Sequence, residues 1–253
     1  GDFKVDYSPL DGKVIDLNRL SQMGDEGVDL LLCDSTNALR DGYTPSEAVV
    51  RKSIDEIFDN TDKRIIIATF SSNIHRILYF MEASMKHKRR IAVTGRSMEK
   101  VMNIARELGY MDRLPEKIFI DISQINNYKD SNLTIITTGS QGEPMSALTR
   151  MADGNHKTVK LKKGDVVVFS SSPIPGNEKV ISSVVNKLYE KEVDVVLASH
   201  MDVHVSGHAS REELKLIHSL LRPRIFVPAH GEYRHMVEHA RLAQSLGQRA
   251  DNI

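Results

Sequence analysis

The segment ASHMDVHVSGHAS (198–210), followed by a helical segment and then by RIFVPAHGEYR (224–234), organises the interpretation of this chain. Two apolar runs, 193–197 and 225–228, lead into it; His208 follows the first run and His230 follows the second. In parallel α/β sheets, ligands bind at the carboxyl ends of the strands. Histidine is the commonest metal ligand and the usual proton shuttle near neutral pH. We therefore predict a functional site where these two segments meet.

Length and composition favour one large domain or two small ones, because 253 residues are enough to bury a substantial core. The 34 Lys+Arg residues balance the 34 Asp+Glu residues, which argues against a strongly basic surface but allows a local basic groove. The single cysteine, Cys33, excludes an internal disulfide, fits a reducing cytoplasm and is expected to be buried. No membrane span and no signal peptide are expected. The first residues, GDFKVDYSP, read like the middle of a fold, so we expect a piece of a longer protein.

Repeated strand–loop–helix units predict an α/β fold with a parallel sheet and helices on both faces. We expect strands at 28–33, 64–70, 90–94, 118–122, 133–137, 166–169, 193–197 and 225–228. We expect helices at 16–24, 44–58, 97–109, 145–151, 177–190 and 233–246. The apolar run Val28–Cys33 is typical of a strand buried on both faces. Thr44 and Glu47 form the expected capping box of the helix over 44–58.

Several polar groups allow two interpretations. Asp34, at the end of a strand, is either a ligand or orienting carboxylate, or the cap of the following turn. The loops TFSSN (69–73), TTGSQGEP (137–144) and FSSSPIPGNE (169–178) either present N–H groups to phosphate or simply begin capped helices. His235 and His239, at i and i+4, favour a solvated helix face over a metal site because the HExxH carboxylate is missing. The basic cluster 86–90 is either solvated or a nucleic-acid contact.

Three motifs together, GDFKVD (1–6), VSGHAS (205–210) and VPAHGE (227–232), resemble the β-CASP branch of the metallo-β-lactamase superfamily. Within that branch the chain is most similar to the ribonuclease J family of bacteria. Further similar segments are CDSTNA (33–38), GYTPSE (42–47), FSSNIHR (70–76), TTGSQGEPMSAL (137–148), FSSSPIPGNE (169–178) and SGHASREE (206–213). The resemblance covers essentially the whole chain. It implies a β-CASP domain over 44–203, flanked by parts of a metallo-β-lactamase core over 1–43 and 204–253.

The resemblance also implies roles for individual residues. Asp2 and His230 match metal ligands, Asp34 matches a carboxylate that supports the active-site histidines, and His208 matches a proton donor beside the reacting phosphate. The implied pocket for an RNA phosphate comprises Ser72, Asn73, Gly207, His208, Ala209 and Ser210. The implied cofactor is a pair of divalent metal ions, zinc first, with manganese or magnesium as alternatives. The family's HxHxDH motif has no match here, so we expect that about half of the ligands are absent, that the fragment is inactive alone, and that it binds few or no ions.

The function implied by the resemblance is a cytoplasmic zinc-dependent ribonuclease with 5′-to-3′ exonuclease and endonuclease activity. Its partner would be single-stranded RNA with a 5′ monophosphate, and the parent protein would form a homo-oligomer. The alternative is a non-catalytic module that binds RNA or nucleotide phosphate. A hydrolase of small esters or lactams is disfavoured, because 44–203 resembles the nucleic-acid branch. Cleavage preference, metal identity and oligomeric state are open at this point.

Overall fold

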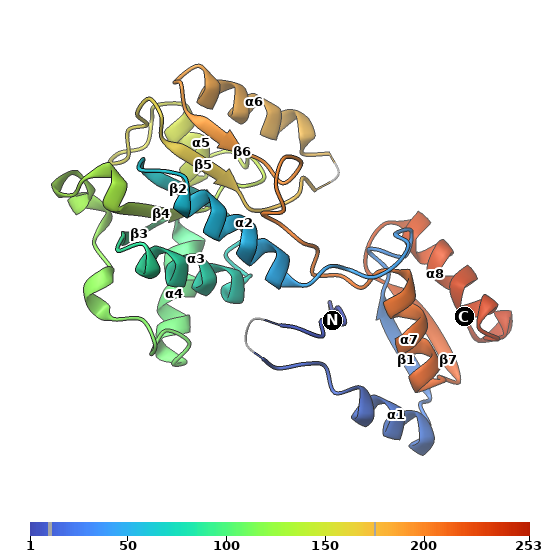
Figure 1. The fold of residues 1–253 in the computed structure, drawn as a ribbon. Coiled ribbons are helices and arrows are strands. Elements are labelled where there is room, and N and C mark those ends of the chain that lie inside the picture. Colours follow the sequence, from blue (N-terminus) through green and yellow to red (C-terminus); the bar gives the residue numbers. More distant parts are fainter. Residues whose placement is uncertain (10–11, 175) are drawn as a thin grey trace. The chain divides into compact units, whose positions relative to one another are not determined.

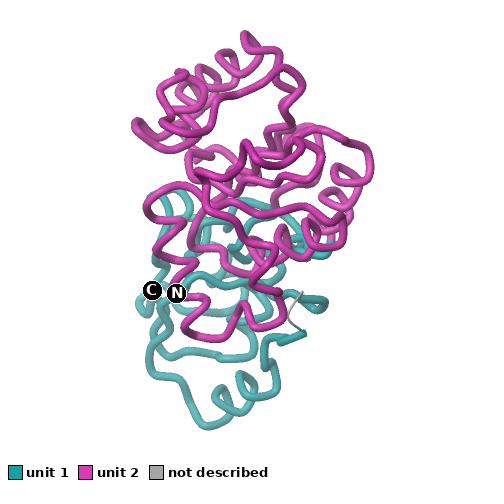
Figure 2. The backbone as a smooth tube through the Cα atoms, turned by 90° about the vertical axis from the view of Figure 1, so that its left-hand side faces the viewer, with its two compact units in different colours: residues 1–48, 205–253 teal, residues 49–204 magenta. Residues whose placement is uncertain are grey.

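The structure, a computed structural model, describes residues 1–9, 12–174 and 176–253. Two compact units make up the chain: residues 1–48 with 205–253 form unit 1, and residues 49–204 form unit 2 (Figure 2). The domain borders at 44 and 203 stay a prediction. Pro175, in the third of the predicted phosphate loops, lies outside the described residues. None of the described helices is long and apolar enough to cross a membrane.

Unit 2 is built on a five-stranded parallel sheet with the order β3-β4-β2-β5-β6. The strands are β2 (Ile65–Ala68), β3 (Arg90–Thr94), β4 (Leu133–Thr137), β5 (Val166–Phe169) and β6 (Asp194–Val196). Every residue of β2, β4 and β5 is buried. Such strands are mostly apolar on both faces, because helices cover both faces of a parallel sheet; the exceptions in β4 are Thr134 and Thr137.

The helices of unit 2 lie on both faces of this sheet (Figure 1). They are α2 (Glu47–Asp59), α3 (Ile74–Lys86), α4 (Arg96–Glu107), α5 (Ala147–Ala152) and α6 (Glu178–Tyr189), with 3-10 turns η1 (Glu116–Ile118), η2 (Ile122–Asn127) and η3 (Asp130–Asn132). Apolar residues of α5, α6 and η2 pack in one core cluster with Ile66, Val167 and Phe169 of the sheet. Helices α2 and α3 cover the opposite face. The predicted α/β class with helices on both faces is confirmed.

Unit 1 contains a two-stranded parallel sheet of β1 (Leu30–Asp34) and β7 (Ile225–Ala229). Its helices are α1 (Leu17–Glu26), α7 (Arg211–Leu221) and α8 (Tyr233–Ser245), followed by the 3-10 turn η4 (Ala250–Asn252). Cys33 and Phe226 face a core that includes Leu214 and Leu242, so the predicted burial of Cys33 is confirmed. The prediction that β1 is buried on both faces is wrong: Leu30 and Leu32 are 50% and 60% exposed.

Two further predictions of secondary structure are wrong for identifiable reasons. Residues 118–122 do not form a strand, because the Asp121 carboxylate accepts the Ser123 N–H and begins a 3-10 turn, which leaves only an isolated bridge between Ile91 and Phe119. Thr44 does not cap a helix, because α2 begins at Glu47. The polar groups of Thr44 are bonded in unit 1 instead, as described below.

The basic cluster 86–90 has a structural role at its most buried member. Arg89 is only 3% exposed, and its guanidinium donates to the backbone carbonyls of Thr61, Lys63 and Leu133. Lys86, at the end of α3, pairs with Asp55 of α2 at 3.2 Å. Arg89 therefore links the segment before β2 to the first residue of β4, so its guanidinium has a structural role.

Candidate active site

The buried Asp34 and the half-buried His208 form the inner part of the site in unit 1. Asp34 ends β1 and is 5% exposed. Its Oδ2 lies 2.7 Å from Nδ1 of His208, and its Oδ1 accepts hydrogen bonds from the N–H and the hydroxyl of Thr36. Asp34 therefore bonds to a histidine and also caps its own turn, and its role in catalysis stays a prediction.

The pairing shifts the pKa of both groups. Burial raises the pKa of Asp34, but the hydrogen bonds from His208 and Thr36 outweigh it and lower that pKa to about 2. The hydrogen bond to Asp34 raises the pKa of His208, against the opposing effect of burial. Because Nδ1 faces the carboxylate, the protonated ring offers only its Nε2–H to other groups.

Asp2 and His230 lie beside the His208 ring. Asp2, His208 and His230 each offer a ligand atom, and these three atoms lie within 4.8 Å of one another. His230 Nε2 is 3.7 Å from Asp2 Oδ1, and the rings of His208 and His230 have centroids 5.5 Å apart. Asp2 and His230 supply one carboxylate and one imidazole, donor types that suit zinc or manganese, while His208 already uses its Nδ1 for Asp34. The described residues therefore fit a metal ion, with Asp2 and His230 as the exposed ligands.

The backbone around His230 has an uncommon conformation. His230 has φ 61°, in the left-handed region that non-glycine residues rarely adopt. Gly231 follows with φ 91°, and a Cβ at this position would lie 3.3 Å from Cα of Thr36. Strain of this kind clusters at functional sites, where the surrounding fold maintains it. The close approach of Gly231 to Thr36 places His230 beside the end of β1.

Glu213, which the sequence analysis did not identify, joins three segments beneath the site. Its side chain, in the first turn of α7, is fully buried. Its Oε1 accepts the N–H of Val5 at 2.7 Å, and its Oε2 accepts the N–H groups of Thr44 and Ser210 at 2.6 and 2.8 Å. The signal was present, since Ser210 and Glu213 have the spacing of a capping box. The contacts with Val5 and Thr44 could be seen only in the structure.

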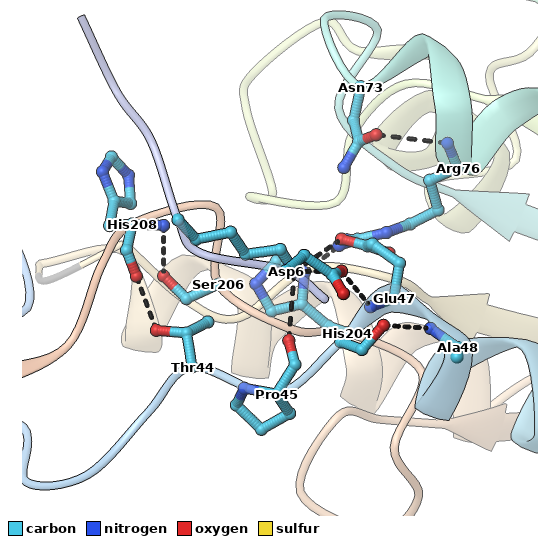
Figure 3. Close-up of polar contacts among 12 residues, drawn as sticks. Asp6, Thr44, Pro45, Glu47, Ala48, Asn73, Arg76, His204, Ser206 and His208 are labelled. Carbon is cyan, nitrogen blue, oxygen red and sulfur yellow. Dashed lines mark hydrogen bonds and ion pairs between the residues drawn. The ribbon is translucent and has the colours of Figure 1, made fainter. Parts of the chain in front are cut away.

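Three side chains hold the backbone of His208 in place, and Figure 3 shows Thr44 and Ser206 beside it. The Thr44 hydroxyl and the Asn37 amide both donate to the carbonyl of His208, at 2.7 and 2.8 Å. The N–H of His208 donates to the hydroxyl of Ser206 at 3.2 Å. The imidazole therefore projects from a backbone bonded on both sides, which limits the positions available to its Nε2.

The residues predicted to hold a phosphate fall into both units. In unit 1, Gly207 is exposed and Ala209 is buried, while Ser210 uses its N–H for Glu213 and places its hydroxyl 2.9 Å from that of Thr44. In unit 2, Ser72 is exposed and Asn73 caps α3 by accepting the Arg76 N–H (Figure 3). Their role in phosphate binding stays a prediction.

The i, i+4 histidine pair on α8 is not the solvated face expected from the sequence. His239 is 1% exposed, packs edge-on against Phe226 and has Nδ1 3.0 Å from the hydroxyl of Ser35. Burial lowers the pKa of His239 to about 4. His235 accepts the N–H of Glu232 at the start of α8. His239 therefore packs in the core and His235 caps the start of α8, because this side of α8 faces the sheet.

Comparison with known proteins gives a consistent family signal. The model described as "Ribonuclease J, beta-CASP domain" matches residues 62–188, and that described as "Zn-dependent metallo-hydrolase RNA specificity domain" matches residues 192–252. Ribonuclease J of Synechocystis sp. is 44% identical over 253 residues, which are 100% of this chain and 39% of the relative. Ribonuclease J of Helicobacter pylori is 47% identical over 253 residues, 100% of this chain and 37% of the relative. That of Thermus thermophilus is 45% identical over 248 residues, 98% of this chain and 43% of the relative. The chain thus spans less than half the length of these relatives.

Proposed function

Since this chain belongs to the ribonuclease J family, we propose that it takes part in the metal-dependent hydrolysis of RNA phosphodiester bonds. The observation that carries the proposal is the placement of His208, backed by Asp34 at 2.7 Å, beside the converging ligand atoms of Asp2 and His230. A proton donor next to metal ligands is an arrangement that can catalyse phosphodiester hydrolysis, because the metal activates water and the donor protonates the leaving oxygen.

In the proposed reaction, water adds to phosphorus and gives up a proton to the solvent, and the phosphorus–oxygen ester bond breaks. The leaving oxygen takes a proton from Nε2 of His208, which regains one from the solvent. Asp34 keeps the ring oriented and favours its protonated form, as the raised pKa of His208 supports. Asp2 and His230 would hold divalent metal, with zinc as the first candidate and manganese or magnesium as alternatives. Bound metal ions would supply a more acidic water and stabilise charge on the attacking and leaving oxygens.

The finer features of the substrate are also part of the proposal. We propose single-stranded RNA with a 5′ monophosphate, cut from the 5′ end and internally, with Ser72, Asn73 and residues 207–210 as the phosphate contacts. The family description that mentions an RNA specificity domain supports an RNA partner. We further propose a cytoplasmic location and a homo-oligomer for the whole protein.

The ligand count leads to an expectation about the 253-residue chain itself. Two metal ions at three to four protein ligands each need more donors than Asp2 and His230 supply. We therefore propose that residues 1–253 alone do not cleave RNA, and that a chain extended N-terminally with further histidine ligands does. The decisive experiment measures zinc and manganese content and RNA cleavage for both chains.

Matched variants make this experiment specific. In the extended chain, H208Q should abolish cleavage while metal content is kept, and H230A should lower both. The control is H200Q, an exposed histidine of unit 2, which should change neither quantity. Cleavage by the 253-residue chain that survives H230A would contradict the metallo-ribonuclease proposal. Tight, salt-sensitive RNA binding that metal does not affect would instead favour the non-catalytic binding module.

A further inference from the structure

A cavity of about 290 Å³ lies in unit 2 at the carboxyl ends of β5 and β6. It is lined by Ser140, Phe169, Ser171, Ser172, Pro173, Ile181, Leu197, Ala198 and Ser199. Ligands in open α/β sheets bind at this edge. The loop after β4, which carries Ser140, reaches the same cavity although β2 separates β4 from β5 in the sheet.

The loops around the cavity are rigidly joined by one buried side chain. Gln141 is 3% exposed, and its amide nitrogen donates to the Ser171 hydroxyl at 3.0 Å and to the carbonyl of Ser172 at 2.9 Å. Its amide oxygen accepts the N–H of Ile174 at 2.8 Å. Gly142 allows the same loop to close on α6, because a Cβ there would lie 3.1 Å from the backbone nitrogen of Ile181. The cavity is therefore preformed.

The chemistry of the cavity does not suit an anion. No Lys, Arg or His is among the nine described residues that line it. The N–H of Gln141 donates to the Glu143 carboxylate and that of Gly176 donates to the Glu178 carboxylate, while that of Ile174 is taken by Gln141. These three N–H donors of the two loops are thus already bonded, two of them to negative groups. Phosphate binding by TTGSQGEP (137–144) and FSSSPIPGNE (169–178) is correspondingly disfavoured.

The cavity suits a neutral, partly apolar group with hydrogen-bonding edges. Phe169, Ile181 and Leu197 supply apolar walls. Ser140 is 2% exposed, and its hydroxyl, which can donate and accept, has no hydrogen-bond partner within residues 1–9, 12–174 and 176–253. The volume falls at the lower end of small-molecule sites. A single nucleobase matches this size and polarity.

We propose that this cavity binds one unpaired nucleobase of the RNA substrate, with the hydroxyl of Ser140 hydrogen-bonded to the base edge. The proposal rests on the proposed function, because it takes the ligand from RNA. It assigns to unit 2 the recognition of a base, in addition to any contact with the RNA backbone.

The test titrates the 253-residue chain separately with adenosine, uridine and inorganic phosphate and observes binding as ¹H–¹⁵N NMR chemical-shift changes. We expect saturable shifts with at least one nucleoside and none with phosphate. A198L, which fills the cavity, should abolish these shifts, and S140A should weaken nucleoside affinity about threefold to tenfold by removing one hydrogen bond. The matched controls are A240L on α8 and S183A on the exposed side of α6, which should leave the affinity unchanged.

The outcomes separate this proposal from the proposed function. Absence of nucleoside binding, or shifts that persist in both A198L and S140A, would overturn the base site whatever the protein does to RNA. Phosphate shifts that A198L removes would overturn it in favour of an anion site. If A198L fails to fold, S140A alone decides through the nucleoside affinity. Nucleoside binding that A198L abolishes supports the base site even if the metal-loaded extended chain does not cleave RNA, a result that would count against the proposed function alone.

Discussion

Replacing Glu213 with glutamine should loosen the part of unit 1 that holds Asp2 and His208. The carboxylate is fully buried and accepts three backbone N–H groups at 2.6–2.8 Å. A glutamine side chain has one acceptor oxygen. If that oxygen occupies the Oε2 position, it keeps the bonds from Thr44 and Ser210, and the amide NH₂ then faces the N–H of Val5.

The magnitude follows from this geometry. E213Q loses one charge-assisted hydrogen bond, worth about 1.5–3 kcal/mol, and leaves a buried N–H without an acceptor, which costs a similar amount. Relief of the buried charge offsets part of the loss, so we expect unit 1 to be destabilised by about 2–4 kcal/mol. E213A should cost more, because all three N–H groups lose their acceptor and a cavity is added.

Native-state hydrogen exchange is the appropriate assay, because it reports the opening free energy of β7 and α7 separately from unit 2. E212Q is the matched control, since Glu212 is the preceding residue and its carboxylate bonds only to Lys215 and accepts no buried N–H in the described structure. E213Q should also weaken metal binding, because Val5 lies three residues from Asp2. Equal exchange rates in E213Q and E212Q would refute the reasoning.

Three other perturbations test separate features of the fold. The pKa of His239 in the folded protein is about 4, against an ordinary value of 6.5. The contribution of neutral His239 to the free energy of unfolding of unit 1 should therefore be fully present above pH 6.5 and fall by a few kcal/mol toward pH 4. In urea unfolding measured as a function of pH, H239Q should flatten this profile. G231A should destabilise unit 1 by about 1–3 kcal/mol, since its Cβ meets neighbouring atoms at positive φ, whereas G247A, with open space around it, should cost less in the same assay. R64M leaves the buried carboxylate of Asp165 without its ion-pair partner and should lower the free energy of unfolding of unit 2 by about 3–5 kcal/mol. Hydrogen exchange in unit 1 should stay unchanged, and equal effects on both units would contradict this.

Local sequence patterns were sufficient for the elements whose environment is uniform. The strands 90–94, 133–137 and 166–169 occur at the predicted residues, because apolar runs bounded by polar residues specify buried parallel strands without reference to distant segments. The outer face of β1 shows where this pattern fails. An apolar run can indicate burial on both faces, but whether a layer covers each face depends on the rest of the fold, and Leu30 and Leu32 are exposed here.

For the site, the sequence indicated the residue types and motifs but not the hydrogen-bond partners of each side chain. Asp34, His208 and His230 were candidates because a carboxylate and imidazoles followed strand ends, Asp2 was a candidate through the family resemblance, and the structure brings them together. The role of Glu213 depended on tertiary structure, because its contacts with Val5 and Thr44 join residues 208 and 169 positions apart.

The sequence alone therefore determined the class of fold, the positions of most strands and the chemical types gathered at the site, since each of these depends on local pattern. Tertiary structure alone decided that His239 is buried and neutral, that Thr44 bonds to His208 instead of capping a helix, and that Gln141 joins two loops around a cavity. The physical reason is the same in each case. A polar side chain can satisfy its hydrogen bonds in several ways, and only the packing of distant segments selects one of them.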